Sequence, residues 1–257
     1  MTTRSPNDWL TCPRPNPDAR VRLFCIPYAG GGPHIFYGWV DSLPPWIEVW
    51  AVIPPGRGRR IAESPFTSVV PLARSLARSM MSSLDLPFVF FGHSMGALIA
   101  YETSRQLGRS IGAFPEHLFV SGCFAPHLPD PHPLHELPDH EFIEEARKLG
   151  GMPEQVIENR ELMELMLPTL RADFTLAETY QCNAGAPLPC PITAFAGDAD
   201  SLAAGPDVMA WQSHTTGGFE MHTFPGGHFF LQTSQDDLLA MIAGTLGAKV
   251  ERVAATG

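Results

Sequence analysis

Short, continuous apolar runs alternate along the chain with longer segments whose apolar residues recur at helical spacing. Continuous apolar runs are typical of strands in a parallel sheet, which are buried on both faces. A helix is expected at 69–80, another after 88–92, and a last one over about 232–246. Strands that alternate with helices predict an α/β fold: a mostly parallel central sheet with helices on both faces. The predicted strands are residues 21–27, 47–54, 88–92, 117–122, 192–197 and 219–227.

The stretch 125–190 breaks this alternation. It has no convincing strand, and its pattern predicts several short helices. Asp139 and Asn159 are suitable helix caps, Pro153 could open a helix, and Pro168 should kink or split one. We therefore expect a helical insertion that forms a lid over the end of the sheet. The resulting division is an extended leader over 1–20, a core over 21–124 and 191–249, and a lid insertion over 125–190.

Composition narrows the class of protein. A chain of 257 residues with 44% hydrophobic residues is long enough for one sizeable core. Its formal net charge of −10 excludes a typical nucleic-acid binder, which needs clustered Lys and Arg. The start of the chain does not resemble a signal peptide, and no apolar run has the length of a membrane span. Five irregularly spaced cysteines indicate reduced thiols, so a cytoplasmic protein with no membrane partner is expected.

A nucleophile motif follows the strand at 88–92. Residues 92–96, GHSMG, fit G-x-S-x-G between a strand and a helix. This chemistry needs a serine on a sharp turn, small residues two positions away, and a helix N-terminus directed at developing negative charge. We predict Ser94 as the nucleophile. The structural alternative is that Gly92 and Gly96 only allow close packing and that Ser94 caps the helix.

An acid and a base should follow the nucleophile in the order Ser, Asp or Glu, His. Asp198 and Asp200 both come after the strand at 192–197, and Asp200 is favoured because it lies further from the strand. Asp198 is the reserve candidate. His228 lies between the last strand and the last helix, in PGGHFF, which suits the base. The alternative is that these are ordinary loop carboxylates and a histidine at a helix start.

Two backbone N–H groups should bind the oxyanion of a tetrahedral intermediate. One is expected from Met95, directly after the nucleophile. The second should come from the glycine-rich loop after the first core strand, where Ala29 is the first candidate and Gly30 the next.

Three histidines in the insertion, His132, His135 and His140, lie near Asp130 and Asp139 and superficially resemble a metal cluster. Their surroundings are irregular and rich in proline, and no known ligand spacing occurs, so no metal site is expected.

Together these motifs resemble the type II thioesterases, the editing enzymes of polyketide synthases and nonribosomal peptide synthetases. The resemblance runs from about residue 23 to about 239 and rests on PYAGGG, PGRGRR, GHSMGALIAYE, LPTLRADF, GDAD and PGGHFFL. It implies an α/β-hydrolase fold with a lid, and removal of stalled or wrong acyl groups from the phosphopantetheine thiol of acyl or peptidyl carrier proteins. It implies no cofactor of the enzyme's own, and it places Ser94, Asp200 and His228 on the triad and Ala29 and Met95 on the oxyanion donors.

Residues for the acyl chain and for the carrier protein are harder to choose. The acyl channel is expected to involve four apolar or aromatic side chains, those of Tyr28, Met163, Leu167 and Phe174. Carrier proteins are usually acidic, as this chain is, so a local basic patch should offset the repulsion. The arginines of PGRGRR, otherwise a solvated loop, are the candidates: Arg57, Arg59 and Arg60.

Other functions share the same catalytic groups. A carboxylesterase would act on oxygen esters, and an acyltransferase would replace water with an alcohol or amine. A binding module that had lost turnover is the non-enzyme alternative. A monomer is the default expectation.

Overall fold

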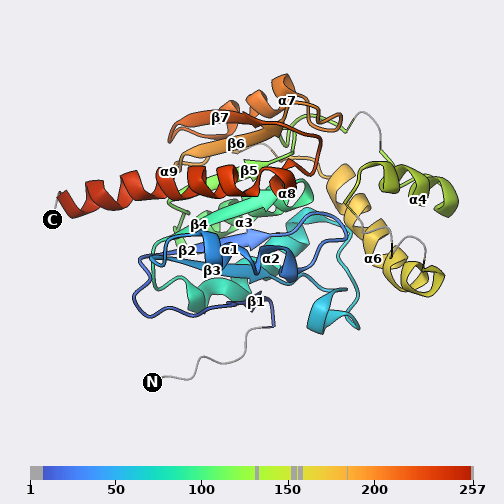
Figure 1. Cartoon of the computed structure of the whole chain (residues 1–257), viewed down its shortest axis with the longest axis horizontal. Coiled ribbons are helices and arrows are strands. Elements are labelled where there is room, and N and C mark those ends of the chain that lie inside the picture. The colour runs from blue at the N-terminus through green and yellow to red at the C-terminus, as the bar shows by residue number, and fades with distance from the viewer. Residues whose placement is uncertain (1–7, 131–132, 152–154, 156–158, 184, 256–257) are drawn as a thin grey trace.

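A computed structural model describes residues 8–130, 133–151, 155, 159–183 and 185–255 (Figure 1). No helix in these ranges combines the length and the hydropathy that a membrane crossing needs. The strands are β1 Leu10–Thr11, β2 Val21–Ile26, β3 Ile47–Val52, β4 Phe88–His93, β5 His117–Ser121, β6 Ile192–Gly197 and β7 Phe219–Phe224. The α-helices are α1 Trp39–Ser42, α2 Val69–Met80, α3 Met95–Ile111, α4 Asp139–Lys148, α6 Arg160–Glu178, α7 Gly205–Met209, α8 Phe230–Thr233 and α9 Gln235–Ala255.

The described strands form one seven-stranded sheet in the order β1-β3-β2-β4-β5-β6-β7. Neighbouring strands are parallel except β1 and β3, which are antiparallel. The mostly parallel sheet predicted from the apolar runs is therefore confirmed, and β6 has the predicted bounds. Strand β1 was not predicted. It comes from the expected leader and pairs Leu10 with Val52, so part of that leader belongs to the sheet.

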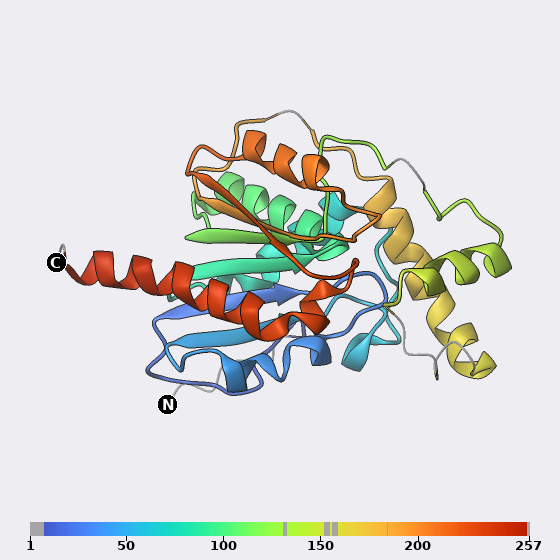
Figure 2. The same ribbon diagram turned by 45° about the horizontal axis from the view of Figure 1, so that its top comes forward.

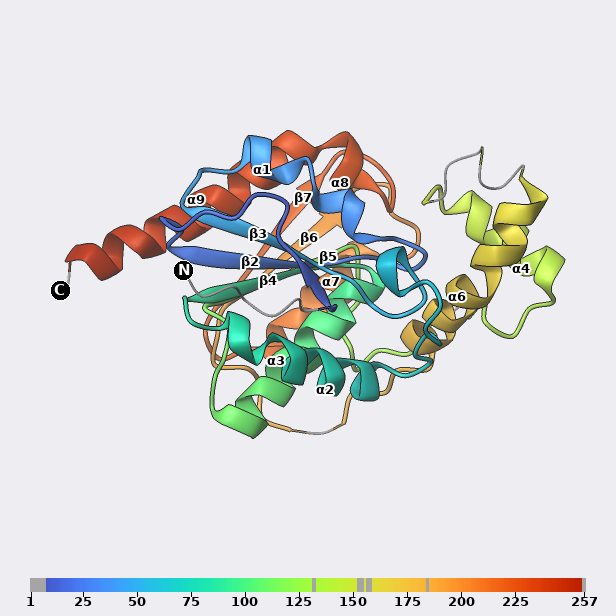
Figure 3. The ribbon, with the colours of Figure 1, turned by 90° about the horizontal axis from the view of Figure 1, so that it is seen from below.

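Helices cover both faces of the sheet, as expected (Figure 3). Helices α2 and α3 lie on one face, and α1 and α9 lie on the other. Each face has its own apolar core: Leu76, Leu98 and Trp211 belong to the first, and Trp39, Phe230 and Leu239 to the second. The α2 bounds match the predicted helix. This arrangement leaves the carboxyl ends of the parallel strands, where ligands bind in such sheets, uncovered by the two layers.

The insertion supplies α4 and α6, which extend beyond one end of the sheet (Figures 1 and 2). The side chain of Asn159 accepts a hydrogen bond from Leu162 N at 3.1 Å, so the predicted cap is confirmed. The predicted Asp139 cap is wrong, because Asp139 is the first helical residue and its carboxylate accepts a bond from Arg171. Pro168 lies inside α6 without splitting it. The helix expected to open at Pro153 lies outside the described residues.

Candidate active site

Ser94 lies on the sharp turn between β4 and α3. Its φ is 53° and its ψ is −123°, and it is the only non-glycine residue with positive φ in the described part of the chain. A Cβ on Gly92 would lie 2.1 Å from Gly96 O, and one on Gly96 would lie 2.3 Å from Ile26 O. Both glycines are therefore required by close backbone packing. Ser94 occupies the N-cap position of α3, but its side chain makes no cap bond, so capping does not account for a serine there.

The acid and base candidates meet across two loops. His228 Nδ1 lies 2.9 Å from Asp200 Oδ2, and both side chains are buried. Asp200 Oδ1 accepts hydrogen bonds from Leu202 N and Ala203 N, which fix the carboxylate. Asp198 accepts a bond from Gly226 N and braces the loop instead. The geometry thus selects Asp200 over Asp198 as the partner of His228.

Ser94 and His228 line the same cavity, which has a volume of about 560 Å³. Among the described residues no hydrogen bond joins the Ser94 hydroxyl to His228, although both side chains line this cavity. Such bonds are often long in unliganded enzymes. Because Asp200 engages Nδ1, Nε2 is the ring nitrogen left for proton transfer.

The two predicted oxyanion donors line this cavity beside Ser94. Met95 is the first residue of α3, where backbone N–H groups have no acceptor within the helix. Ala29 lies in the loop after β2. The alternative, Gly30, is not available as an oxyanion donor, because its N–H already donates to Asp173 Oδ2 at 2.8 Å.

Two of the four residues predicted for the acyl channel lie in the cavity wall. Tyr28 and Phe174 line it. Met163 and Leu167 do not: Met163 is buried elsewhere, and Leu167 packs against the small core between α4 and α6. Sequence spacing did not show which face of α6 turns toward the cavity. Leu170, which the prediction missed, lines it instead.

A buried histidine, His93, lies beside His228, the predicted base. The ring centroid of His93 is 5.0 Å from that of His228, and its Nδ1 is 2.9 Å from the Ser121 hydroxyl. Burial, and secondarily the nearby His228, hold the pKa of His93 well below its usual 6.5. His93 therefore stays neutral and does not repel a protonated His228.

The arginines predicted to contact a carrier protein do not form an exposed patch. Arg57 and Arg60 are each only 7% exposed. Arg57 pairs with Asp173 at 2.6 Å, and Arg60 pairs with Glu63 at 2.6 Å. The prediction is wrong for these two residues, because their charges are turned inward to partners within the chain. The side chain of Arg59 is 45% exposed.

The histidine-rich stretch makes other contacts. His135 Nδ1 lies 2.7 Å from Glu178, and His140 lies near Glu141. His132 lies outside the described residues. Within the described ranges no three His, Cys, Asp or Glu side chains gather as a metal site would require.

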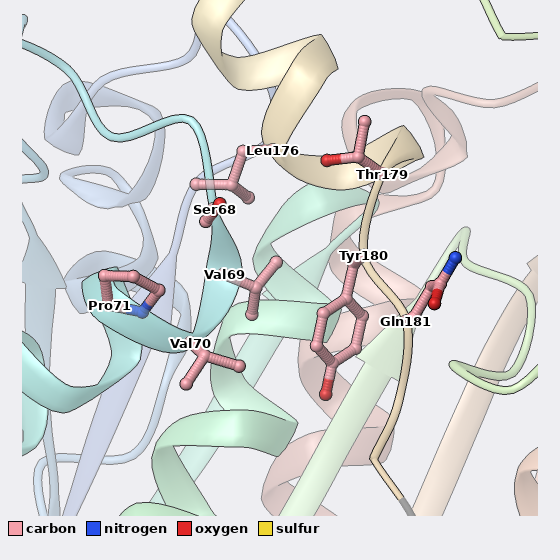
Figure 4. Close-up of a pocket in the computed structure, with 8 residues that line it drawn as sticks. All are labelled: Ser68, Val69, Val70, Pro71, Leu176, Thr179, Tyr180 and Gln181. Carbon is pink, nitrogen blue, oxygen red and sulfur yellow. The ribbon is translucent and has the colours of Figure 1, made fainter.

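A second cavity, of about 290 Å³, lies between the end of α6 and the start of α2 (Figure 4). Leu176 and Tyr180 line one side of it, and Val69 and Pro71 line the other. It contains neither Ser94 nor His228, so the candidate chemistry belongs to the larger cavity.

The chain is similar in sequence and in structure to known thioesterases. The family model described as "Thioesterase domain" matches residues 21–246. The chain is 44% identical to linear gramicidin dehydrogenase LgrE of Brevibacillus parabrevis, over 94% of each chain. It is 41% identical to thioesterase PikA5 of Streptomyces venezuelae, covering 87% of this chain and 80% of that one. The structure of BorB, a type II thioesterase from the borrelidin biosynthetic cluster, is 38% identical, covers 95% of this chain and 99% of its own, and superposes with a TM-score of 0.85.

Proposed function

Because this chain belongs to the thioesterase family, in the type II group of polyketide and nonribosomal peptide systems, we propose that it clears stalled or wrong acyl groups from carrier proteins. The substrate is an acyl thioester on the phosphopantetheine thiol of an acyl or peptidyl carrier. The observation that carries this proposal is that Ser94, with its positive φ, shares one cavity with His228, which is paired with Asp200.

The geometry supports an acyl-serine mechanism with proposed roles for five residues. His228 takes the proton of Ser94 as the Oγ attacks the thioester carbonyl, and Asp200 stabilises the imidazolium. The N–H groups of Ala29 and Met95 stabilise the oxyanion. The C–S bond then breaks, and the departing thiolate takes the proton from His228.

Release of the acyl group repeats the sequence with water. His228 removes a proton from water, which attacks the acyl-serine carbonyl, and the proton then returns to Ser94 as the free acid leaves. A thiolate departs more easily than an alkoxide, so hydrolysis of the acyl-serine is the more demanding step.

We propose that residues 125–190 act as the lid of this cavity. Ala146 of α4 and both Leu170 and Phe174 of α6 contribute to its wall, next to Tyr28 from the core. The wall is mostly apolar, which suits an acyl chain, and four charged residues of the insertion also line it: Asp130, Glu145, Lys148 and Glu178.

Hydrolysis of matched substrates tests the function. A panel of acyl groups should be loaded on a carrier protein and compared with the same groups on a short thiol and as oxygen esters. We expect free acid as the product, with kcat/KM highest for the carrier-bound thioesters. A preference for oxygen esters would support a carboxylesterase, and an acylated alcohol or amine as product would support an acyltransferase.

Four finer assignments accompany this proposal. Arg59 is the one arginine of its cluster that we still propose as a carrier contact. The motifs also resemble the thioesterase of the rifamycin pathway. We propose that pathway as the source of the substrate, and alignment with that enzyme should give identity well above the 44% found for LgrE. The cytoplasmic location and the monomeric state stay predictions.

LgrE is named a dehydrogenase, and we looked for a dinucleotide-binding loop in this sequence. Neither glycine pair with G-x-G spacing, at 30 and 32 or at 56 and 58, is followed by the third glycine of a dinucleotide-binding loop. We therefore do not extend that activity to this chain.

A further inference from the structure

A buried ion pair joins the insertion to the loop that carries a predicted oxyanion donor. Asp173, on α6, is only 2% exposed. Its Oδ1 accepts a bond from Arg57 Nη2 at 2.6 Å, and its Oδ2 accepts one from Gly30 N at 2.8 Å. Arg57 Nη1 in turn donates to Gly31 O at 2.9 Å. We call this set, Asp173 and Arg57 with the backbone of Gly30 and Gly31, the clamp.

Close packing holds α6 against the same loops. Gly30 has a φ of +74°, and a Cβ there would lie 2.8 Å from Leu170 Cδ1. The hydroxyl of Thr169 donates to Gly56 O at 3.1 Å. Consecutive turns of the helix therefore contact the loop after β2 and the loop that carries Arg57.

The clamp uses a charged pair where an apolar pair could also hold the helix, and this choice indicates a role beyond packing. Burying two charges is costly, and an apolar pair of similar size could hold a helix against a loop at least as well. A carboxylate does what an apolar side chain cannot: it accepts from a guanidinium and from a backbone N–H at the same time. The Gly30 N–H belongs to the peptide plane between Ala29 and Gly30, which adjoins the plane that carries the Ala29 N–H, so fixing it restricts rotation about the backbone bonds of Ala29.

We propose that Asp173 is a positioning residue, which through Gly30 and Arg57 holds the Ala29 N–H in its oxyanion-binding orientation. The proposal rests on the function proposed above, in that Ser94 carries the acyl group and Ala29 is a donor. An oxyanion donor is effective only when it is already aimed at the site where charge develops. A helix of the insertion thus contributes to the catalytic frame as well as to the cavity wall.

Asp173→Asn tests the proposal, because the amide cannot accept from both donors and loses the charge. With an acetyl or propionyl group on a short thiol, we expect kcat to fall about 10- to 100-fold while KM stays within about threefold, since removing one oxyanion donor outright costs about 100- to 1,000-fold. Affinity for an alkyl trifluoromethyl ketone, which forms a tetrahedral adduct with Ser94, should fall by the same factor. All rates are normalised to active sites titrated with a fluorophosphonate.

Glu48→Gln is the matched control. Glu48 is 5% exposed and pairs with Arg22 at 2.8 Å, at the amino end of β3, opposite the active site. This variant should lose stability to a similar extent and keep its kcat per active site. Arg57→Lys is a milder test should Asp173→Asn fail to fold. A lysine keeps the charge but lacks the fork that reaches both Asp173 and Gly31 O, so a smaller loss of kcat is expected at unchanged KM.

Several outcomes would overturn the clamp. One is an unchanged kcat per active site in both Asp173→Asn and Arg57→Lys. Another is a raised KM at constant kcat in these variants, which would mean that the clamp only shapes the acyl channel. An equal kcat loss in Glu48→Gln would show a general effect of stability. The short-thiol substrate separates this test from the proposed function. If the enzyme did not act on carrier-bound acyl groups, the clamp variants could still be compared with the wild type on the short acyl thioester.

Discussion

Backbone strain at Ser94, the proposed nucleophile, should be measurable as a gain in stability when its Cβ is removed. Ser94 holds a φ of 53° and a ψ of −123°, a conformation that a residue with a Cβ rarely adopts. Such positions cost about 1–3 kcal/mol each. Ser94→Ala keeps the Cβ and therefore the strain, whereas Ser94→Gly removes both.

The expected difference follows from two opposing terms. Glycine loses about 0.5–1 kcal/mol more backbone entropy on folding than alanine does. Relief of strain should exceed this, so the free energy of unfolding should be about 1 kcal/mol higher for Ser94→Gly than for Ser94→Ala. The same alanine-to-glycine change at Ala240, an exposed position in α9, should instead lower it by about 1 kcal/mol.

Urea unfolding followed by circular dichroism measures all three variants against the wild type. Neither variant at position 94 should turn over substrate, so the comparison isolates stability. If Ser94→Gly is less stable than Ser94→Ala by the amount that Ala240→Gly loses, no strain is stored at the nucleophile and this reasoning is refuted.

Three further predictions concern packing, the acid and pH. Gly96→Ala places a Cβ 2.3 Å from a carbonyl oxygen of β2 and should lower the free energy of unfolding by about 3 kcal/mol, whereas Gly244→Ala, which meets nothing within 4 Å, should raise it slightly; urea midpoints that match would contradict this. Asp200→Asn should lower kcat on a short acyl thioester about 10⁴-fold and Asp198→Asn only a few-fold, and the reverse order would move the acid to Asp198. Burial, followed by neighbouring positive charge, lowers the pKa of His214 to about 4. The unfolded chain therefore takes up this proton first, and stability should fall as pH drops from 6.5 to 4, by about 1–2 kcal/mol after allowance for partial exposure. His214→Gln should flatten that part of the pH profile, and an unchanged profile would refute the assignment.

The sequence predicted the parts of the site that follow from topology. Continuous apolar runs identified buried parallel strands, and the carboxyl ends of such strands meet at one edge of the sheet. The motif and the chain order selected Ser94, Asp200 and His228, and these residues follow β4, β6 and β7 at that edge. The choice between Asp198 and Asp200 needed the loop geometry, because both lie within three residues of the strand end.

The sequence did not reveal which charges are buried. Arg57 looked like part of a solvated basic loop, because its partner Asp173 lies 116 residues away on a helix whose orientation no local pattern specifies. Met163 and Leu167 were assigned to the acyl channel for a related reason: the sequence does not show which face of α6 turns toward the cavity. Strand β1 was missed because two residues are too short to form a periodic pattern.

Mass spectrometry of the acylated protein tests the central claim most directly. The protein should be mixed with a propionyl-loaded carrier protein, quenched in acid within the first turnovers, and digested for peptide mapping. A propionyl group on the peptide that contains Ser94, appearing before free propionate and absent in Ser94→Ala, is the predicted result. Release of propionate at the wild-type rate by Ser94→Ala, or an adduct on a different residue, would contradict the account.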